Sequence, residues 1–206
     1  MNRTGSGGGL FRSGPKVSAA DRVRDYARAQ VRAGLLDPAG VQREVTDAVA
    51  AERDVPDASA VAVALVEQAH DDLVAEARGW PERTDHDRLQ AAFGDLAVDD
   101  VIVLQGVDDH WAAQAVLRQG ANEGRLPAGV VWFTPPDVWH AVDHGMLELN
   151  VWHGDSANVQ AGDPLLDLVI GRLAGHGLAA HFDEGRVEVA AFWQSRAALG
   201  RHLPPT

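Results

Sequence analysis

The sequence predicts an α+β fold, with a helical N-terminal region followed by a mixed sheet of about five strands with flanking helices. Up to about residue 82, apolar residues recur at the three- and four-residue spacing of amphipathic helices. Beyond about residue 100, short apolar runs and alternating apolar and polar residues indicate strands. We therefore expect a helical region at residues 18–82 and an α/β sheet region at residues 83–203, either as two domains or as one continuous domain.

The first 17 residues are rich in Gly and Ser and carry only positive charge. Such a segment buries too little apolar surface to offset the entropy lost on ordering, so residues 1–17 are predicted to form a disordered tail. The alternative is a short docking arm anchored by Leu10 and Phe11.

Capping residues and breakers mark four helices in the first half of the chain. The first runs from about Ser18, as a capping residue, to Gly34, a natural stop. The second opens with Asp37 as N-cap, and the third begins near Asp57 and ends before residues 79–81. A fourth helix is predicted from the capping box at residues 84–87.

The second half alternates predicted strands with predicted helices. We expect strands at residues 101–105, 129–134 and 147–152, and a hairpin of residues 178–182 and 186–190 around a short turn. We expect helices at residues 108–123, 135–144, 163–177 and 193–202. The first of these should bury Trp111, Ala115 and Leu117.

Composition excludes several classes of function. The chain of 206 residues has no cysteine, which excludes disulfides, thiolate metal sites and thiol nucleophiles, and a reducing compartment, the cytoplasm, is the expected location. The net charge of −12 argues against nucleic-acid binding, because phosphates repel an acidic surface. No apolar run is long enough for a signal peptide or a membrane span, and no motif indicates a cofactor.

Four residues form a possible metal set. His140 and His144 are four positions apart on a predicted helix and so share one face. Two zinc ligands of metalloproteases have this spacing, although Ala141 stands where the glutamate base would follow the first histidine. Asp137 lies one turn earlier, and His153 ends the next strand. The alternative is that both helical histidines are ordinary surface residues.

The tryptophans suggest a recognition surface instead. The chain has six Trp and one Tyr, and Trp152 falls on the polar face of its predicted strand. Tryptophan is enriched at the energetic centres of protein interfaces. We therefore expect Trp139, His140, Trp152 and His153 to bind a partner, with burial in the core as the alternative for the two tryptophans.

Several short segments carry a family resemblance over about residues 80–196. They are Trp80-Pro81, residues 84–89 (TDHDRL), Ala92-Phe93, residues 129–133 (GVVWF) with Asp137, residues 145–149 (GMLEL), Val187-Glu188-Val189, and residues 193–196 (WQSR). In these segments the chain resembles a bacterial family of uncharacterised proteins known as a domain of unknown function. The resemblance implies an α+β domain behind a helical segment, and it implies no activity.

These observations favour a non-catalytic protein-binding or regulatory module. Its acidic surface would suit a protein partner with basic character. The first alternative is a metal-dependent hydrolase that uses the four-residue His/Asp set. The second is a homo-oligomeric structural protein that assembles through its helical region.

Overall fold

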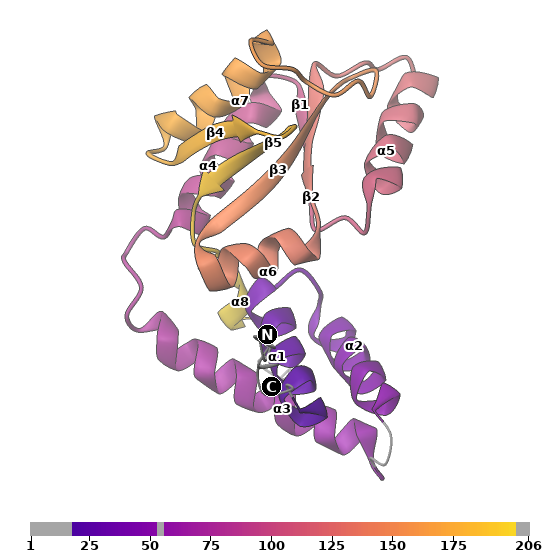
Figure 1. Cartoon of the computed structure of the whole chain (residues 1–206), viewed down its shortest axis with the longest axis vertical. Coiled ribbons are helices and arrows are strands. Elements are labelled where there is room, and N and C mark those ends of the chain that lie inside the picture. The colour runs from indigo at the N-terminus through magenta and orange to yellow at the C-terminus, as the bar shows by residue number, and fades with distance from the viewer. Residues whose placement is uncertain (1–17, 53–55, 201–206) are drawn as a thin grey trace, which may run out of the picture.

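The computed structural model describes residues 18–52 and 56–200. These residues form a helical layer and a sheet layer, which lie at opposite ends of the molecule (Figure 1). The predicted tail at residues 1–17, with Leu10 and Phe11, and the end of the predicted last helix lie outside the described residues. Among the described residues, no helix combines the length and apolar character that a bilayer-spanning segment requires.

The helical layer consists of α1 (Ala19–Ala33), α2 (Pro38–Ala51) and α3 (Ala58–Ala77). Each begins where the capping residues predict. The side chains of Ser18, Asp37 and Asp57 accept hydrogen bonds from backbone N–H groups three residues later, at 3.1, 2.6 and 2.9 Å. Gly34 ends α1 in the left-handed conformation, with φ of 60°. The three helices pack on one another around a shared apolar core.

The sheet layer contains five strands in the order β1-β2-β3-β5-β4, as the α+β prediction requires. They are β1 (Val101–Gln105), β2 (Gly129–Phe133), β3 (Met146–His153), β4 (Ala179–Asp183) and β5 (Arg186–Ala190). Only β1 and β2 run parallel, so the sheet is mixed. The predicted hairpin is present, because Asp183 pairs with Arg186 across a two-residue turn in which Glu184 and Gly185 have positive φ.

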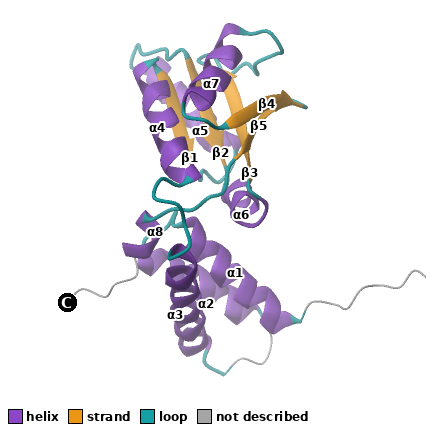
Figure 2. Cartoon of the chain, turned by 90° about the vertical axis from the view of Figure 1, so that its left-hand side faces the viewer, coloured by secondary structure: helices purple, strands orange, loops and turns teal. Residues whose placement is uncertain are grey.

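Helices cover both faces of this sheet (Figure 2). One face packs on α4 (Asp85–Val98) and α7 (Pro164–Gly175), which bury the alternating apolar residues of β3 and β5. On the other face, α5 (His110–Asn122) covers β1 and β2. The connection from β2 to β3 is α6 (Pro135–His144), which lies at the end of the sheet next to the helical layer (Figure 1).

The face that α5 buries differs from the prediction. Trp111 is 58% exposed and Ala115 is also exposed, while Ala113, Leu117 and Gly120 are buried. Leu117 is therefore the only correct member of the predicted set. Trp111 is two positions before Ala113, which places it on the opposite side of the helix from the sheet.

The predicted helix at residues 193–202 is wrong over its first turn. Residues 191–195 belong to no helix or strand, and α8 covers only Ala197–Gly200. The extended segment follows the end of α6. The backbone N–H of Trp193 donates to the Ala141 carbonyl at 3.3 Å, and the backbone N–H of Ala191 donates to the Gly145 carbonyl at 2.9 Å. The chain then crosses to the helical layer, where Ala198 is buried.

Candidate functional site

The proposed metal set is not assembled. The Asp137 carboxylate caps α6, where it accepts hydrogen bonds from the Thr134 N–H and hydroxyl, both at 2.7 Å. The rings of His140 and His144 lie 4.6 Å apart on the exposed side of the same helix. Their shared face is therefore as predicted, but the carboxylate expected beside them is already engaged.

His153 lies elsewhere, at the far end of β3. Its Nε2 is 3.1 Å from the Asp163 carboxylate. The pKa of Asp163 is lowered, first by the hydrogen bond from the Gln160 N–H and then by the contact with His153. Across residues 18–52 and 56–200, no group of three or more His, Cys, Asp or Glu side chains could hold a metal ion.

The four residues expected to bind a partner are divided between the two ends of the sheet. Trp139 and His140 are on α6, whereas Trp152 and His153 end β3. The eight residues of that strand correspond to roughly 25 Å of chain. Trp152 is half-buried and packs edge-on against Trp132, with ring centroids 5.1 Å apart. The four residues therefore do not share one compact surface.

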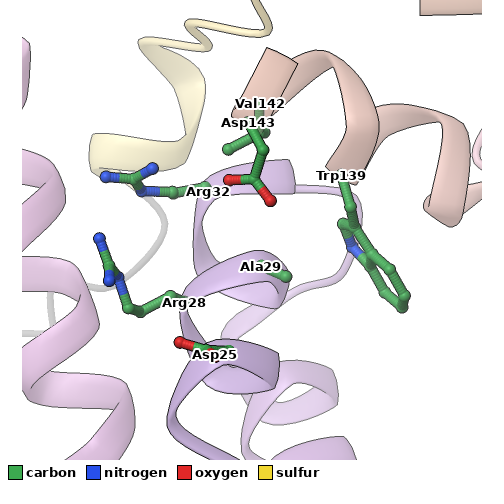
Figure 3. Close-up of a pocket in the computed structure, with 7 residues that line it drawn as sticks. All are labelled: Asp25, Arg28, Ala29, Arg32, Trp139, Val142 and Asp143. Atoms are coloured by element: carbon green, nitrogen blue, oxygen red, sulfur yellow. The ribbon is translucent and has the colours of Figure 1, made fainter. Parts of the chain in front are cut away.

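Trp139 borders a pocket between the two layers, which we call the junction cleft (Figure 3). The cleft has a volume of about 190 Å³ and lies between α1 and α6. Its lining residues are Asp25, Arg28, Ala29 and Arg32 of α1, and Trp139, Val142 and Asp143 of α6. Of these residues, only Trp139 is predicted from the sequence to lie at a binding site.

A second pocket of about 170 Å³ continues the junction cleft toward α3. The two pockets share Arg32 and Val142. The second is also lined by Leu73, Glu76, Trp80, Phe192, Trp193 and Gln194. Residues from α1, α3, α6 and the extended C-terminal segment therefore meet along one line at the boundary between the layers.

Unused hydrogen-bond donors concentrate along this line. Among the described residues, four buried side-chain atoms lack a hydrogen-bond partner, and all four are N–H groups. Three of them, Arg28 Nε, Trp80 Nε1 and Trp139 Nε1, belong to residues that line the two pockets. The fourth, Trp132 Nε1, lies under α5. Buried donors are almost always paired, so three in adjacent pockets are unusual.

The two arginines of the cleft differ in their partners. Arg32 forms an ion pair with Glu76 of α3. Arg28 makes no ion pair or hydrogen bond with any described residue, and its Nε is buried. In Figure 3 both guanidinium groups extend to the same side of α1, and the Asp143 carboxylate points from α6 toward that helix. Of the two arginines, Arg28 is therefore the one without an ion-pair partner among the described residues.

The Trp139 ring is held in place by the helical layer. It packs edge-on against Tyr26, with ring centroids 5.8 Å apart. The Tyr26 hydroxyl accepts a hydrogen bond from Gln30 at 2.7 Å and donates to Glu44 at 3.1 Å. Burial raises the pKa of Tyr26, so its hydroxyl remains a donor at neutral pH. This chain of contacts fixes the wall of the cleft.

Comparison with known proteins identifies the family. The family described as "Domain of unknown function (DUF6891)" matches residues 16–197. The chain belongs to this family. The DUF6891 match begins just before α1 and ends at the first residue of α8, so it includes both layers and the junction cleft. No curated protein and no solved structure matches the chain.

Proposed function

We propose that this DUF6891 protein is a non-catalytic, cytoplasmic protein-binding module that holds its partner at the junction cleft. The supporting observation is the set of three buried N–H groups without acceptors along the two pockets. A buried donor without a partner costs about 1–3 kcal/mol. These three N–H groups have almost no surface open to solvent, so a partner would supply acceptors to them by displacing the side chains that cover them.

The shape of the site favours a protein segment as the ligand. Each pocket has a volume below 200 Å³, while small-molecule sites usually enclose about 300–1,000 Å³. Two small adjacent pockets suit successive side chains of an extended segment. The net charge of −12 would attract a partner with basic character. Trp152 and His153 lie outside this cleft and have no role in the proposal.

Affinity capture from the native host tests this function. The wild-type chain, an Arg28→Ala/Trp139→Ala variant and an Arg118→Ala control would carry the same tag. Arg118 is exposed on α5 and makes no ion pair with any described residue, so its loss should be neutral. We expect a discrete partner with the wild-type and control proteins and at least a tenfold loss, on the order of 1.4 kcal/mol, with the double variant.

Two results would contradict the proposal. Equal recovery with all three proteins would place the partner elsewhere on the surface. A solution mass that is a multiple of the chain mass, with no other protein bound, would favour the homo-oligomeric alternative. Circular dichroism of the double variant must match the wild type, because Trp139 also packs on Tyr26.

A further inference from the structure

We propose that the outer edge of β1 binds an extended segment of a protein partner as an added strand of the sheet. The segment that fits has apolar residues at its centre and a basic residue at each end. This inference goes beyond the proposed function, because β1 lines neither the junction cleft nor the pocket that continues it.

The edge of β1 has backbone groups without partners. Among the described residues β2 is its only neighbouring strand, and β1 ends the sheet on the side opposite to β4 (Figure 2). Apart from the ladder with β2, the backbone of residues 101–105 makes no hydrogen bond to any described residue. The three central residues of β1 are half-buried, whereas all of β2 is buried. An edge strand in this state can pair with another extended chain.

The two edges of the sheet differ in their side chains. At the opposite edge, β4 carries His181 in its middle and Asp183 at its end. Polar and charged residues on an edge strand discourage strand addition. The sequence of β1 is VIVLQ, which contains no charged residue and no Pro. The helices α4 and α5 pack on its two faces, but neither supplies a backbone partner at its edge. β1 is therefore the edge that suits an added strand.

A pocket beside β1 can hold an apolar side chain of that strand. It has a volume of about 450 Å³, and Ile102, Val116 and Leu126 contribute apolar lining. Ile102 packs on the face of the sheet that α5 covers. Paired residues of neighbouring strands point to the same face, so the residue opposite Ile102 would lie next to this pocket. Leu126 is 66% exposed, so its contact with a partner would remove apolar surface from water.

The charges around β1 define the ends of the bound segment. Residues 95–109 contain five aspartates and no lysine or arginine. Asp100 precedes β1 and Asp108 follows it, and both are exposed without an ion pair to any described residue. Arg125 also lines the pocket, but it is paired with Glu123. A basic residue at each end of a short apolar strand can therefore lie near an unpaired carboxylate.

Solution NMR of the full ¹⁵N-labelled chain tests this inference with defined peptides. The probe is a capped peptide with alternating valine and threonine at five central positions and arginine at both ends. The first control peptide has glutamate in place of both arginines. The second has N-methyl groups on its central amides, so it keeps the side chains but cannot complete a strand ladder. Chemical shifts report binding, and hydrogen exchange of the β1 amides reports strand pairing.

We expect the arginine peptide to slow hydrogen exchange about tenfold or more at alternate β1 amides. The amides that face β2 are already bonded, and those that face outward become bonded on binding. The glutamate peptide should bind about tenfold more weakly, because it places like charges beside the aspartates. The N-methylated peptide should give no saturable shift.

A charge variant tests the two aspartates. Asp100→Asn/Asp108→Asn should weaken the arginine peptide about fivefold at low salt, with a smaller effect at high salt. Asparagine also tolerates the positive φ of position 100. Glu67→Gln/Asp71→Asn is the matched control, because it removes two exposed charges from α3 and should leave binding unchanged.

A second variant tests the apolar pocket. Leu126→Ser should weaken the arginine peptide about threefold, because it removes exposed apolar lining without touching the backbone of β1. Val63→Ser is the matched control, because Val63 is also exposed but lies on α3.

The inference is overturned if no peptide protects the β1 amides, if the N-methylated or glutamate peptide binds as well as the arginine peptide, or if Asp100→Asn/Asp108→Asn binds unchanged. Protection of the same amides at high protein concentration without peptide would also overturn it, because a second copy would then occupy the edge. Arg28→Ala/Trp139→Ala should bind the arginine peptide as the wild type does. Loss of binding in that variant would place the peptide in the junction cleft and end this inference, without ending the proposed function.

Discussion

The two layers of this protein have cores of different composition. The helical layer buries Ala27, Val31, Val41, Val45, Val49, Ala62, Ala69, Leu73 and Ala198, so Leu73 is its largest buried side chain. The sheet layer buries Phe93, Phe133 and Trp193 together with many leucines. Small side chains let helices approach closely, but each removes less apolar surface from water, at about 25 cal/mol per Å². The helical layer therefore gains less from its own core.

Contacts from the end of the chain compensate for this difference. Ala198 of α8 belongs to the core of the helical layer, and the Trp193 indole N–H donates to the Ala33 carbonyl of α1 at 2.9 Å. The Trp193 ring itself packs in the sheet core, 5.7 Å from the ring of Phe133. The core of the sheet layer is therefore formed mainly by its own elements, whereas the helical layer depends on contacts with the C-terminal segment that follows the sheet.

Trp193→Ala should produce the largest effect. Removing this buried ring leaves a cavity and an unpaired Ala33 carbonyl, so we expect the free energy of unfolding to fall by about 3–5 kcal/mol. Trp111→Ala is the matched control, because the same substitution at a residue that is 58% exposed should cost about 0.5 kcal/mol or less. Chemical denaturation followed by circular dichroism measures both.

The shape of that unfolding curve sharpens the comparison. If the helical layer depends on the C-terminal segment, helical signal should be lost in the Trp193→Ala variant before the sheet unfolds. Equal stability of the Trp193→Ala and Trp111→Ala variants would show that the layers are not coupled through this residue.

Gly34→Ala should have a smaller effect on the packing of the C-terminal segment against the helical layer. Gly34 has φ of 60°, and an added Cβ would lie 2.9 Å from the Cβ of Ala198. We expect a loss of about 1–3 kcal/mol in the free energy of unfolding, from backbone strain and from displacement of α8. Gly171→Ala in α7 is the control, because the added Cβ would have no neighbouring atom within 4 Å. This substitution should raise the free energy of unfolding by about 0.5–1 kcal/mol. A neutral Gly34→Ala would mean that α8 moves away without cost.

The pH dependence of His86 should be the smallest effect. His86 packs against Trp193 with ring centroids 4.7 Å apart, on the sheet side of the boundary. Burial lowers its pKa, against a weaker opposing influence of the Asp87 charge. On acidification, His86 of the unfolded chain binds a proton at about pH 6.5, whereas His86 of the folded chain binds one only at lower pH. The free energy of unfolding should therefore decrease as the pH falls from about 6.5 through the lowered pKa.

Thermal unfolding of the wild type and His86→Gln between about pH 7.5 and pH 5.5 isolates this contribution. The stability of the wild type should decline more steeply with acidification than that of the variant. Parallel curves would show that His86 does not contribute to the pH dependence of stability, and would indicate that its ring is solvated in the folded protein.

Local sequence signals predicted most of the elements but little of the cleft. The helix starts at Ser18, Asp37 and Asp57 depend on side-chain oxygens that bond within three residues, so they can be read directly from the chain. Trp139 was also expected at a binding site. Arg28 and Arg32 are four positions apart on the polar side of α1, but that spacing alone is typical of a solvated helix face.

The sequence by itself determined the fold class, the five strands, most helix boundaries and the absence of cysteine chemistry. Each depends on composition or on contacts between residues close in the chain. Only the tertiary structure decided that α6 packs on α1, that residues 191–195 are extended, and that Asp137 and His153 are held apart. These features depend on contacts between segments far apart in the chain, such as that of Trp193 with Ala33, 160 positions away, which no local pattern encodes.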